Sequence, residues 1–158
     1  MSQRYFDDFE MGDRFVSHGV TVTEGQILDF AMVYDPQPFH IDKIAASKSP
    51  YGGLIASGFH TLALAFRMFY QENLITACSL GSPGLDELRW LKPVRPGDTI
   101  HVETQVREKR PSQSRADRGI LRMLYEVKNQ DGEAVMTFIA IHLLLRRDAQ
   151  PATGATPR

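Results

Sequence analysis

The sequence predicts an α+β fold in which a curved antiparallel β-sheet wraps around one long central α-helix. Three observations support this architecture. A strongly apolar helical segment begins near Gly58 and could continue to about Thr76. Four strand-like segments follow it between positions 85 and 147, with no helix between them. Parallel strands need a long crossover connection, so segments joined without a helix are expected to form one antiparallel sheet.

The first part of the chain is expected to contain a strand and then a helix that ends at an acid. Residues 14–22 are rich in β-branched and aromatic side chains, which favours a strand. Thr23 is followed three residues later by Gln26, the pattern of a capping box, so a helix is expected to begin there. Pro36 disfavours helical geometry at the residue before it, and this helix should therefore end at Asp35.

The central helix is expected to be buried on most of its sides. Gly52 and Gly53 break the chain before it, and Ser57 can act as its N-cap. Its apolar side chains cover more than one stripe of the helix: Phe59, Leu62, Ala63, Leu64, Ala65, Phe66, Met68 and Phe69. A helix that is apolar around most of its circumference must be covered on most sides. The aromatic cluster at 66–70 is therefore expected to belong to the core rather than to a ligand site.

The four strand segments are expected to pair with their neighbours in chain order. They comprise residues 85–94, 98–109, 119–129 and 133–147. Turn sequences separate the first pair, Arg-Pro-Gly-Asp at 95–98, and the last pair, Asn-Gln-Asp-Gly-Glu at 129–133. A sheet of this kind leaves an unpaired edge, which dimers commonly cover, so a homodimer or a higher homo-oligomer is expected.

Length and composition indicate one globular domain. The chain has 158 residues, 42% hydrophobic residues and a formal net charge of −1, which allows one core and gives no field that attracts nucleic acid or an anionic membrane. Residues 1–147 should form this domain, and the polar segment 148–158 should be a disordered tail. The single cysteine, Cys78, cannot form an internal disulfide, and neither a signal peptide nor a membrane-spanning run is recognisable. The expected location is cytoplasmic.

The most informative motif is Tyr-Asp-Pro-Gln-Pro-Phe-His at residues 34–40. Asp35 and His40 could share one water, one of them orienting it and the other exchanging its proton near neutral pH. Five extended residues would span roughly 17 Å, so the loop must fold back for the two side chains to share a water. Pro36 and Pro38 fix two φ angles and would make such a bend rigid. The alternative interpretation is an ordinary turn, with Asp35 as a capping residue and His40 at the surface or the edge of the core.

A second motif, Tyr-Gly-Gly-Leu-Ile-Ala-Ser-Gly at residues 51–58, leads into the central helix. Backbone N–H groups at a helix N-terminus lie at the positive end of the helix dipole, so they can stabilise an oxyanion. Gly53 and Gly58 would let a substrate approach the backbone closely, and Ser57 and His60 lie beside them. The alternative is a turn followed by an ordinary helix cap. Together the two motifs predict a site that combines an acid–base pair with an oxyanion-binding helix start.

These motifs resemble a known family. Residues 34–40 resemble the hydratase signature of the MaoC-like and R-specific enoyl-CoA hydratases, and residues 51–61 resemble the glycine-rich run through which these proteins enter their central helix. The segment Leu-Asp-Glu-Leu-Arg-Trp-Leu-Lys-Pro-Val-Arg-Pro-Gly-Asp-Thr-Ile, at 85–100, looks like their next strand and turn. The resemblance covers about residues 5–146 and implies the hot-dog fold, an antiparallel sheet wrapped around a central helix.

Four positions depart from the family pattern. Gln37 stands where the signature usually has Asn, and Tyr34 stands where it usually has Gly. Ser57 occupies a place where many members carry His or Pro, and Phe66 lies near a place where some carry Ser. These changes leave the acid–base pair intact and bear on the shape of the pocket and the length of the substrate.

The resemblance implies a hydratase or dehydratase that adds water reversibly to a trans-2-enoyl-CoA, or a related enoyl thioester, to give an (R)-3-hydroxyacyl thioester. Asp35 and His40 would act through one water, and a backbone donor near Gly58 would stabilise the thioester enolate. Coenzyme A enters as part of the substrate; no other cofactor and no metal is expected, and an acyl-CoA thioester is the expected partner. Two alternatives are a hot-dog acyl-CoA thioesterase and a non-catalytic acyl-thioester-binding protein.

Three further features have two interpretations each. His60 could line the acyl pocket, but a buried histidine bonded to a backbone group is favoured. Asp42 could orient His40, but it is expected to cap a short helical turn that follows it. The basic segment 107–118 could bind the phosphates of coenzyme A, whereas a solvated hairpin loop is favoured.

Overall fold

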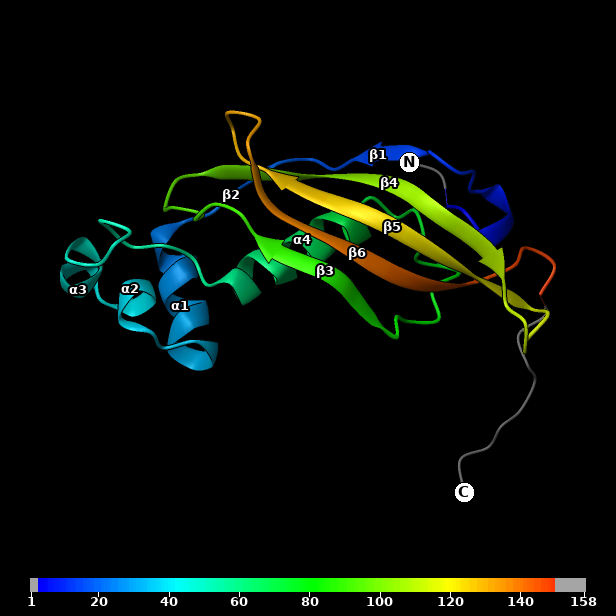
Figure 1. The fold of residues 1–158 in the computed structure, drawn as a ribbon, viewed down its shortest axis with the longest axis horizontal. Helices are drawn as coiled ribbons and strands as arrows, with labels where there is room; N and C mark the ends of the chain where they lie inside the picture. The colour runs from blue at the N-terminus through cyan, green and yellow to red at the C-terminus, as the bar shows by residue number, and fades with distance from the viewer. Residues whose placement is uncertain (1–2, 150–158) are drawn as a thin grey trace, which may run out of the picture.

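The structure is a computed structural model, and it describes residues 3–149. A six-stranded antiparallel sheet curves around α4, the longest helix, while three shorter helices gather at one end of the sheet (Figure 1). The strands are β1 (Arg14–Val16), β2 (Val20–Thr21), β3 (Gly84–Trp90), β4 (Thr99–Pro111), β5 (Arg118–Lys128) and β6 (Ala134–Leu145). The helices are the 3-10 helix η1 (Phe6–Asp8) and the α-helices α1 (Glu24–Tyr34), α2 (Pro38–Ile41), α3 (Lys43–Ser47) and α4 (Gly58–Gln71).

The long strands β4, β5 and β6 form the centre of the sheet. Buried and partly buried residues alternate along them, as expected for strands with one face against a core. The inward-facing side chains pack with α4: Phe69 of the helix lies edge-to-face on Tyr125 of β5, with ring centroids 5.1 Å apart. The predicted α+β class and the wrapping of the sheet around one helix are confirmed.

The prediction that the strand segments 85–94 and 98–109 pair with each other is wrong. The strand order is β1-β4-β5-β6-β3, so β5 and β6 lie between β4 and β3. The turn at 95–98 does form, closed by a hydrogen bond of 3.0 Å from Asp98 N–H to the Arg95 carbonyl. The connection nevertheless crosses from one edge of the sheet toward the other. Ala56 N–H donates to the Val94 carbonyl at 2.8 Å and ties this connection to the segment before α4. That contact has no signal in the local sequence.

The hairpin between β5 and β6 forms where it was predicted. Asn129 N–H donates to the Glu133 carbonyl at 3.0 Å, and Gly132, with a φ of 75°, supplies the left-handed conformation that the turn requires. The predicted strand at 14–22 is interrupted: β1 and β2 both pair with β4, but the residues between them leave the ladder.

The central helix is shorter and less buried than predicted. It ends at Gln71, five residues before Thr76, and Asn73 after it adopts a left-handed φ of 59°. Along the cluster at 66–70, Met68 and Phe69 are buried, whereas Phe66 is 48% exposed and Tyr70 is 37% exposed. One side of α4 therefore faces away from the sheet and is not covered by the described residues.

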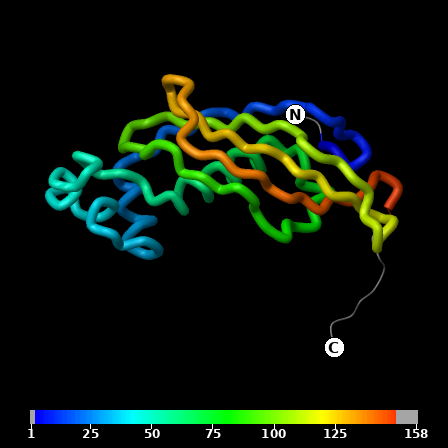
Figure 2. Tube along the Cα trace, in the orientation of Figure 1, coloured from blue at the N-terminus to red at the C-terminus, as the bar shows by residue number. Residues whose placement is uncertain are grey.

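The helices α1 to α3 and the β4–β5 hairpin loop lie at opposite ends of the molecule (Figure 2). The basic segment 107–118 does lie in a hairpin, but its loop is only 112–117, because residues 107–111 continue strand β4, which pairs with β5. None of the helices in residues 3–149 is both long and apolar enough to cross a bilayer. The predicted tail, residues 148–158, lies outside the described residues from position 150 onward.

Candidate active site

Helix α1 carries Asp35 to the site. The helix begins with the predicted capping box: the Thr23 hydroxyl accepts from Gln26 N–H at 3.2 Å, and the Gln26 side chain accepts from Thr23 N–H at 3.1 Å. It ends at Tyr34, and Asp35 is its C-cap residue, with a φ of −153° that is no longer helical. The proline at 36 thus fixes the point at which the chain leaves the helix.

The chain after Asp35 folds back through a second short helix. Pro38 is the first residue of α2, where a proline is favoured because its fixed φ suits the helix and its missing N–H has no helical partner. This single turn brings His40 back toward the end of α1, so that His40 Nε2 lies 3.3 Å from Asp35 Oδ2. The fold-back that the acid–base interpretation requires is therefore present.

His40 is held in one orientation by the backbone. Its ring is buried, and Nδ1 lies 2.7 Å from the carbonyl oxygen of Ile55. A carbonyl only accepts, so Nδ1 carries a proton, and Nε2 is the ring nitrogen that faces Asp35. A carboxylate oxygen and an imidazole lone pair that face each other both need a proton donor. That donor is either a water that bridges the two atoms or, when the imidazole is protonated, the N–H of Nε2 itself.

The carboxylate of Asp35 is fixed by two donors. The Ser57 hydroxyl donates to Oδ2 at 2.7 Å, and the Gln37 amide donates to Oδ1 at 2.8 Å. Burial alone would raise the pKa of the Asp35 carboxyl, but the hydrogen bonds from Ser57 and Gln37 and the nearby His40 outweigh it and hold the pKa below its ordinary value. Asp35 is therefore a carboxylate at neutral pH.

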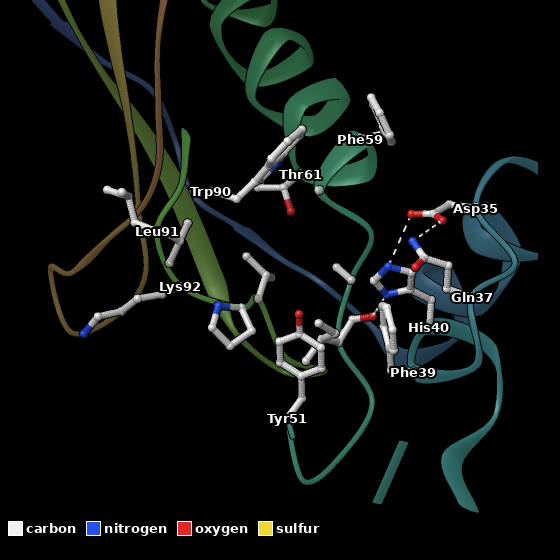
Figure 3. A pocket seen from close by; sticks show the side chains of 16 residues that line it. Asp35, Gln37, Phe39, His40, Tyr51, Phe59, Thr61, Trp90, Leu91 and Lys92 are labelled. Atoms are coloured by element: carbon white, nitrogen blue, oxygen red, sulfur yellow. Dashed lines mark hydrogen bonds and ion pairs between the residues drawn. The ribbon is translucent and has the colours of Figure 1, made fainter. Parts of the chain in front are cut away.

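A cleft of about 430 Å³ opens beside this pair. Asp35 and His40 form one wall, and the first turn of α4, with Gly58 and Thr61, forms another. Figure 3 shows the indole of Trp90 beside Thr61, across the cleft from Tyr51 and Phe39. The connection after β3 supplies four more lining residues, and five others complete the lining: Leu91, Lys92, Pro93 and Val94, and Gln37, Ile55, Ala56, Phe59 and Val135.

Gly58 presents its backbone to the cleft at the start of α4. The first N–H groups of a helix have no partner within the helix, and no acceptor within residues 3–149 takes the Gly58 N–H. A Cβ at this position would lie 2.3 Å from Nε1 of Trp90, so the indole packs directly against the glycine. The position that was predicted to donate to an oxyanion thus lies in the wall of the cleft.

Three other residues predicted for substrate binding do not line the cleft. Ser57 is completely buried, and its hydroxyl accepts from Phe59 N–H at 3.2 Å while it donates to Asp35. Gly53 lies outside the cleft, in the loop beside the Arg95 side chain.

His60 is buried as expected, but the expected backbone partner is absent. Its ring stacks on Phe30 of α1, with centroids 4.7 Å apart and planes 8° apart. Nδ1 has no hydrogen-bond partner among the described residues, and burial lowers the pKa of the imidazole. His60 therefore packs α4 against α1, and it is not among the residues that line the cleft.

Trp90 and Thr61 are lining residues that sequence reasoning did not select. Both lie in segments that resemble the family, 51–61 and 85–100, but those segments do not indicate which of their side chains face the cleft. The alternation of β3 is broken by a bulge between Asp86 and Arg89, where Glu87 has a φ of 53°, and this changes the direction of the side chains that follow.

Metal and phosphate binding have no further support in the described residues. No group of three or more His, Cys, Asp or Glu side chains in residues 3–149 could hold a metal ion. Asp42 caps α3, accepting from Ile44 and Ala45 N–H at 2.9 and 3.0 Å, as predicted. The basic segment 107–118 lies at the other end of the sheet from the cleft (Figure 1).

Comparison with known proteins relates the chain to one family. The family model described as "MaoC like domain" matches residues 9–123. The crystal structure of the MaoC-like dehydratase from Rhodospirillum rubrum is 42% identical, with a TM-score of 0.85 over 91% of this chain and 98% of that chain.

Two relatives align over most of their length. The uncharacterized protein YdeM of Bacillus subtilis is 33% identical over 124 residues, 78% of this chain and 86% of YdeM. The 3-hydroxybutyryl-CoA dehydratase of Methylorubrum extorquens is 27% identical over 137 residues, 84% of this chain and 82% of the enzyme. Other relatives are longer, and the chain spans 32% of one of them.

Proposed function

The chain belongs to the MaoC-like dehydratase family and has the hot-dog fold, and on that premise we propose that it hydrates trans-2-enoyl-CoA, or a related enoyl thioester, reversibly to an (R)-3-hydroxyacyl thioester. The observation that carries the proposal is the 3.3 Å approach of His40 Nε2 to Asp35 Oδ2 in the wall of the cleft. Relatives named as hydratases and dehydratases support this class of reaction.

In the proposed reaction one water bridges the Asp35 carboxylate and the Nε2 lone pair of His40. The water oxygen attacks Cβ of the enoyl thioester while its proton passes to the pair, where an imidazolium beside a carboxylate is stabilised. The electrons of the C=C bond move to the thioester oxygen and form an enolate. The pair then delivers a proton to Cα, which completes the addition of water.

The start of α4 would bind the enolate oxygen. The Gly58 N–H lacks an acceptor among the described residues and lies at the positive end of the helix, where a developing negative charge is stabilised. Because this stabilisation strengthens as the enolate forms, it accelerates the chemical step rather than only binding the substrate.

The substrate is the proposed partner, and coenzyme A is expected as part of it rather than as a bound cofactor. We further propose that the protein is a cytoplasmic homodimer with no nucleic-acid or membrane partner. The uncovered side of α4 and the unpaired edge of the sheet at β3 support the dimer.

Substitution of the acid–base pair tests the proposal. The parent protein should consume crotonyl-CoA or a longer or branched enoyl-CoA, read as loss of the enone absorbance. Asp35→Asn and His40→Gln should each lower this rate by roughly 100-fold or more, because each removes one side of the water-binding pair. Asp29→Asn and His18→Gln are matched controls outside the cleft and should keep the parent rate. Circular dichroism shows whether each variant is folded.

The same substrate panel distinguishes the alternatives. Release of free thiol from acyl-CoA without hydration would identify a thioesterase, and tight binding without turnover would identify a binding protein. A parent protein that hydrates no enoyl thioester of any length or branching would contradict the proposal.

A further inference from the structure

We infer that Ser57 is a positioning residue for catalysis: its buried hydroxyl, assisted by the Gln37 amide, fixes the Asp35 carboxylate as the ionised, correctly oriented partner of His40. This inference rests on the proposed hydration reaction.

The contacts of Ser57 leave its hydroxyl no freedom. The side chain is completely buried, its oxygen accepts from Phe59 N–H at 3.2 Å, and its proton is donated to Asp35 Oδ2 at 2.7 Å. A hydroxyl has a single proton to donate. The Ser57 oxygen accepts in the helix cap, and its one proton is donated to the Asp35 carboxylate. Ser57 thereby joins the start of α4 to the end of α1.

Gln37 holds the other oxygen of the same carboxylate. Its Nε2 donates to Asp35 Oδ1 at 2.8 Å, and its backbone N–H donates to the Asp35 carbonyl at 2.8 Å. Gln37 is exposed, so its hydrogen bond competes with water, whereas that of Ser57 does not. We therefore expect Ser57 to contribute more than Gln37.

Two donors on two oxygens prevent rotation of the carboxylate. Oδ2, the oxygen that accepts from Ser57, is also the oxygen that lies 3.3 Å from His40 Nε2. Without the hydroxyl, the carboxylate could turn away from His40, and a proton could bind Oδ2 more easily. The lowered pKa of Asp35, to which these hydrogen bonds contribute, agrees with this arrangement.

Ser57→Ala and Gln37→Met test the inference by two measurements. Carboxyl ¹³C NMR of aspartate-labelled protein, with Asp35 assigned through Asp35→Asn, should show the Asp35 titration moving up by about one pH unit in Ser57→Ala and by less in Gln37→Met. The kcat/KM for enoyl-CoA hydration should fall about tenfold in Ser57→Ala, mainly through kcat. Ser57→Thr, which keeps a hydroxyl, should restore both values toward those of the parent.

A stability control separates positioning from the loss of the helix cap. Tyr125→Phe removes a buried hydrogen bond outside the cleft, so it should lower the melting temperature without moving the Asp35 titration or kcat/KM. An unchanged Asp35 titration in Ser57→Ala, or an equal loss of kcat/KM in Tyr125→Phe, would overturn the inference. The titration needs no substrate, so it shows whether Ser57 supports the Asp35 carboxylate independently of any activity. A parent protein that hydrates no enoyl thioester would refute the proposed function and leave this titration result unaffected. If Ser57→Thr does not fold, the Asp35 titration and kcat/KM of Ser57→Ala and Gln37→Met still test the inference.

Discussion

Gly58 combines two requirements at a single residue. It lines the cleft at the start of α4, and its missing side chain leaves room for the indole of Trp90, which a Cβ would meet at 2.3 Å. Gly58 is not one of the residues with a positive φ. The need for glycine here therefore comes from close packing rather than from backbone conformation.

We predict that Gly58→Ala destabilises the protein and impairs the site together. The added methyl group must displace Trp90 or the helix, and overpacking of this kind costs about 1–3 kcal/mol. Denaturant unfolding measures the loss. The double variant Gly58→Ala/Trp90→Ala should regain part of it, because the second change removes the clashing ring.

Gly25→Ala is the matched control for this prediction. Gly25 lies in α1, and a Cβ there would meet no atom within 4 Å apart from its chain neighbours and the nearby backbone of its own helix. Alanine is favoured over glycine in a helix by up to about 1 kcal/mol, so this variant should be neutral or more stable. An equal loss of stability in both variants would show that the Trp90 contact is not the cause.

At the scale of elements, a buried polar pair joins β5 and β6 under the central helix. The Tyr125 hydroxyl and His142 Nε2 are 2.9 Å apart, and Phe69 of α4 packs against both rings. Burial lowers the pKa of His142 to about 4 and raises the pKa of Tyr125. Both groups are therefore neutral in the folded protein at neutral pH.

We predict that this pair makes stability depend on pH below neutrality. The folded state keeps His142 neutral down to about pH 4, whereas the unfolded chain takes up a proton below about pH 6.5. Between these values the unfolded state binds more protons, so the free energy of unfolding falls as the pH falls. From pH 7 to pH 5, His142 should account for a loss of about 2 kcal/mol.

Comparison with His142→Gln isolates this contribution. Glutamine can still bond to the Tyr125 hydroxyl but does not titrate, so the variant should lose about 2 kcal/mol less between pH 7 and pH 5 in denaturant unfolding. His60, whose pKa is also lowered by burial, titrates in both proteins and cancels in the difference. Equal pH slopes in the two proteins would contradict the assignment.

Elements whose signals are local were predictable. The Thr23 capping box, the end of α1 before Pro36 and the Asp42 cap of α3 all depend on residues within four positions of one another, and each forms as predicted. Helix α2 was missed because a single turn that begins with a proline has no apolar periodicity. The site was predicted as an acid–base pair, but its geometry depends on that turn.

At the scale of the whole molecule, an apolar patch on α4 and β3 is exposed within the described residues. It comprises Phe59, Phe66 and Tyr70 of α4 and Leu85 and Trp90 of β3, which are between 37% and 58% exposed. The Phe59 and Trp90 rings are in edge-to-face contact, so the patch joins the helix to the edge strand of the sheet. Large exposed patches of this kind commonly mark interfaces.

We predict that Phe66→Glu converts a dimer to a monomer. The parent protein should have twice the mass of one chain when measured by size-exclusion chromatography with light scattering. A charge in the patch would have to be desolvated on association, so the variant should elute at the mass of one chain.

Tyr34→Glu provides the control for the dimer prediction. Tyr34 is 72% exposed but lies at the end of α1, outside the patch, so this variant should remain a dimer. A monomeric parent, or a dimer that survives Phe66→Glu, would contradict an interface at the patch.

The sequence by itself determined the α+β class, the caps of α1 and α3, the hairpin at 129–133 and the selection of Asp35 and His40 as candidate residues, because each depends on neighbouring residues or on the periodicity of apolar side chains. Only the tertiary structure decided that β3 pairs with β6, that Trp90 packs on Gly58 and that Ser57 supports Asp35. These contacts join residues from 22 to more than 50 positions apart, and such contacts form only when the packing of the whole core places the segments side by side.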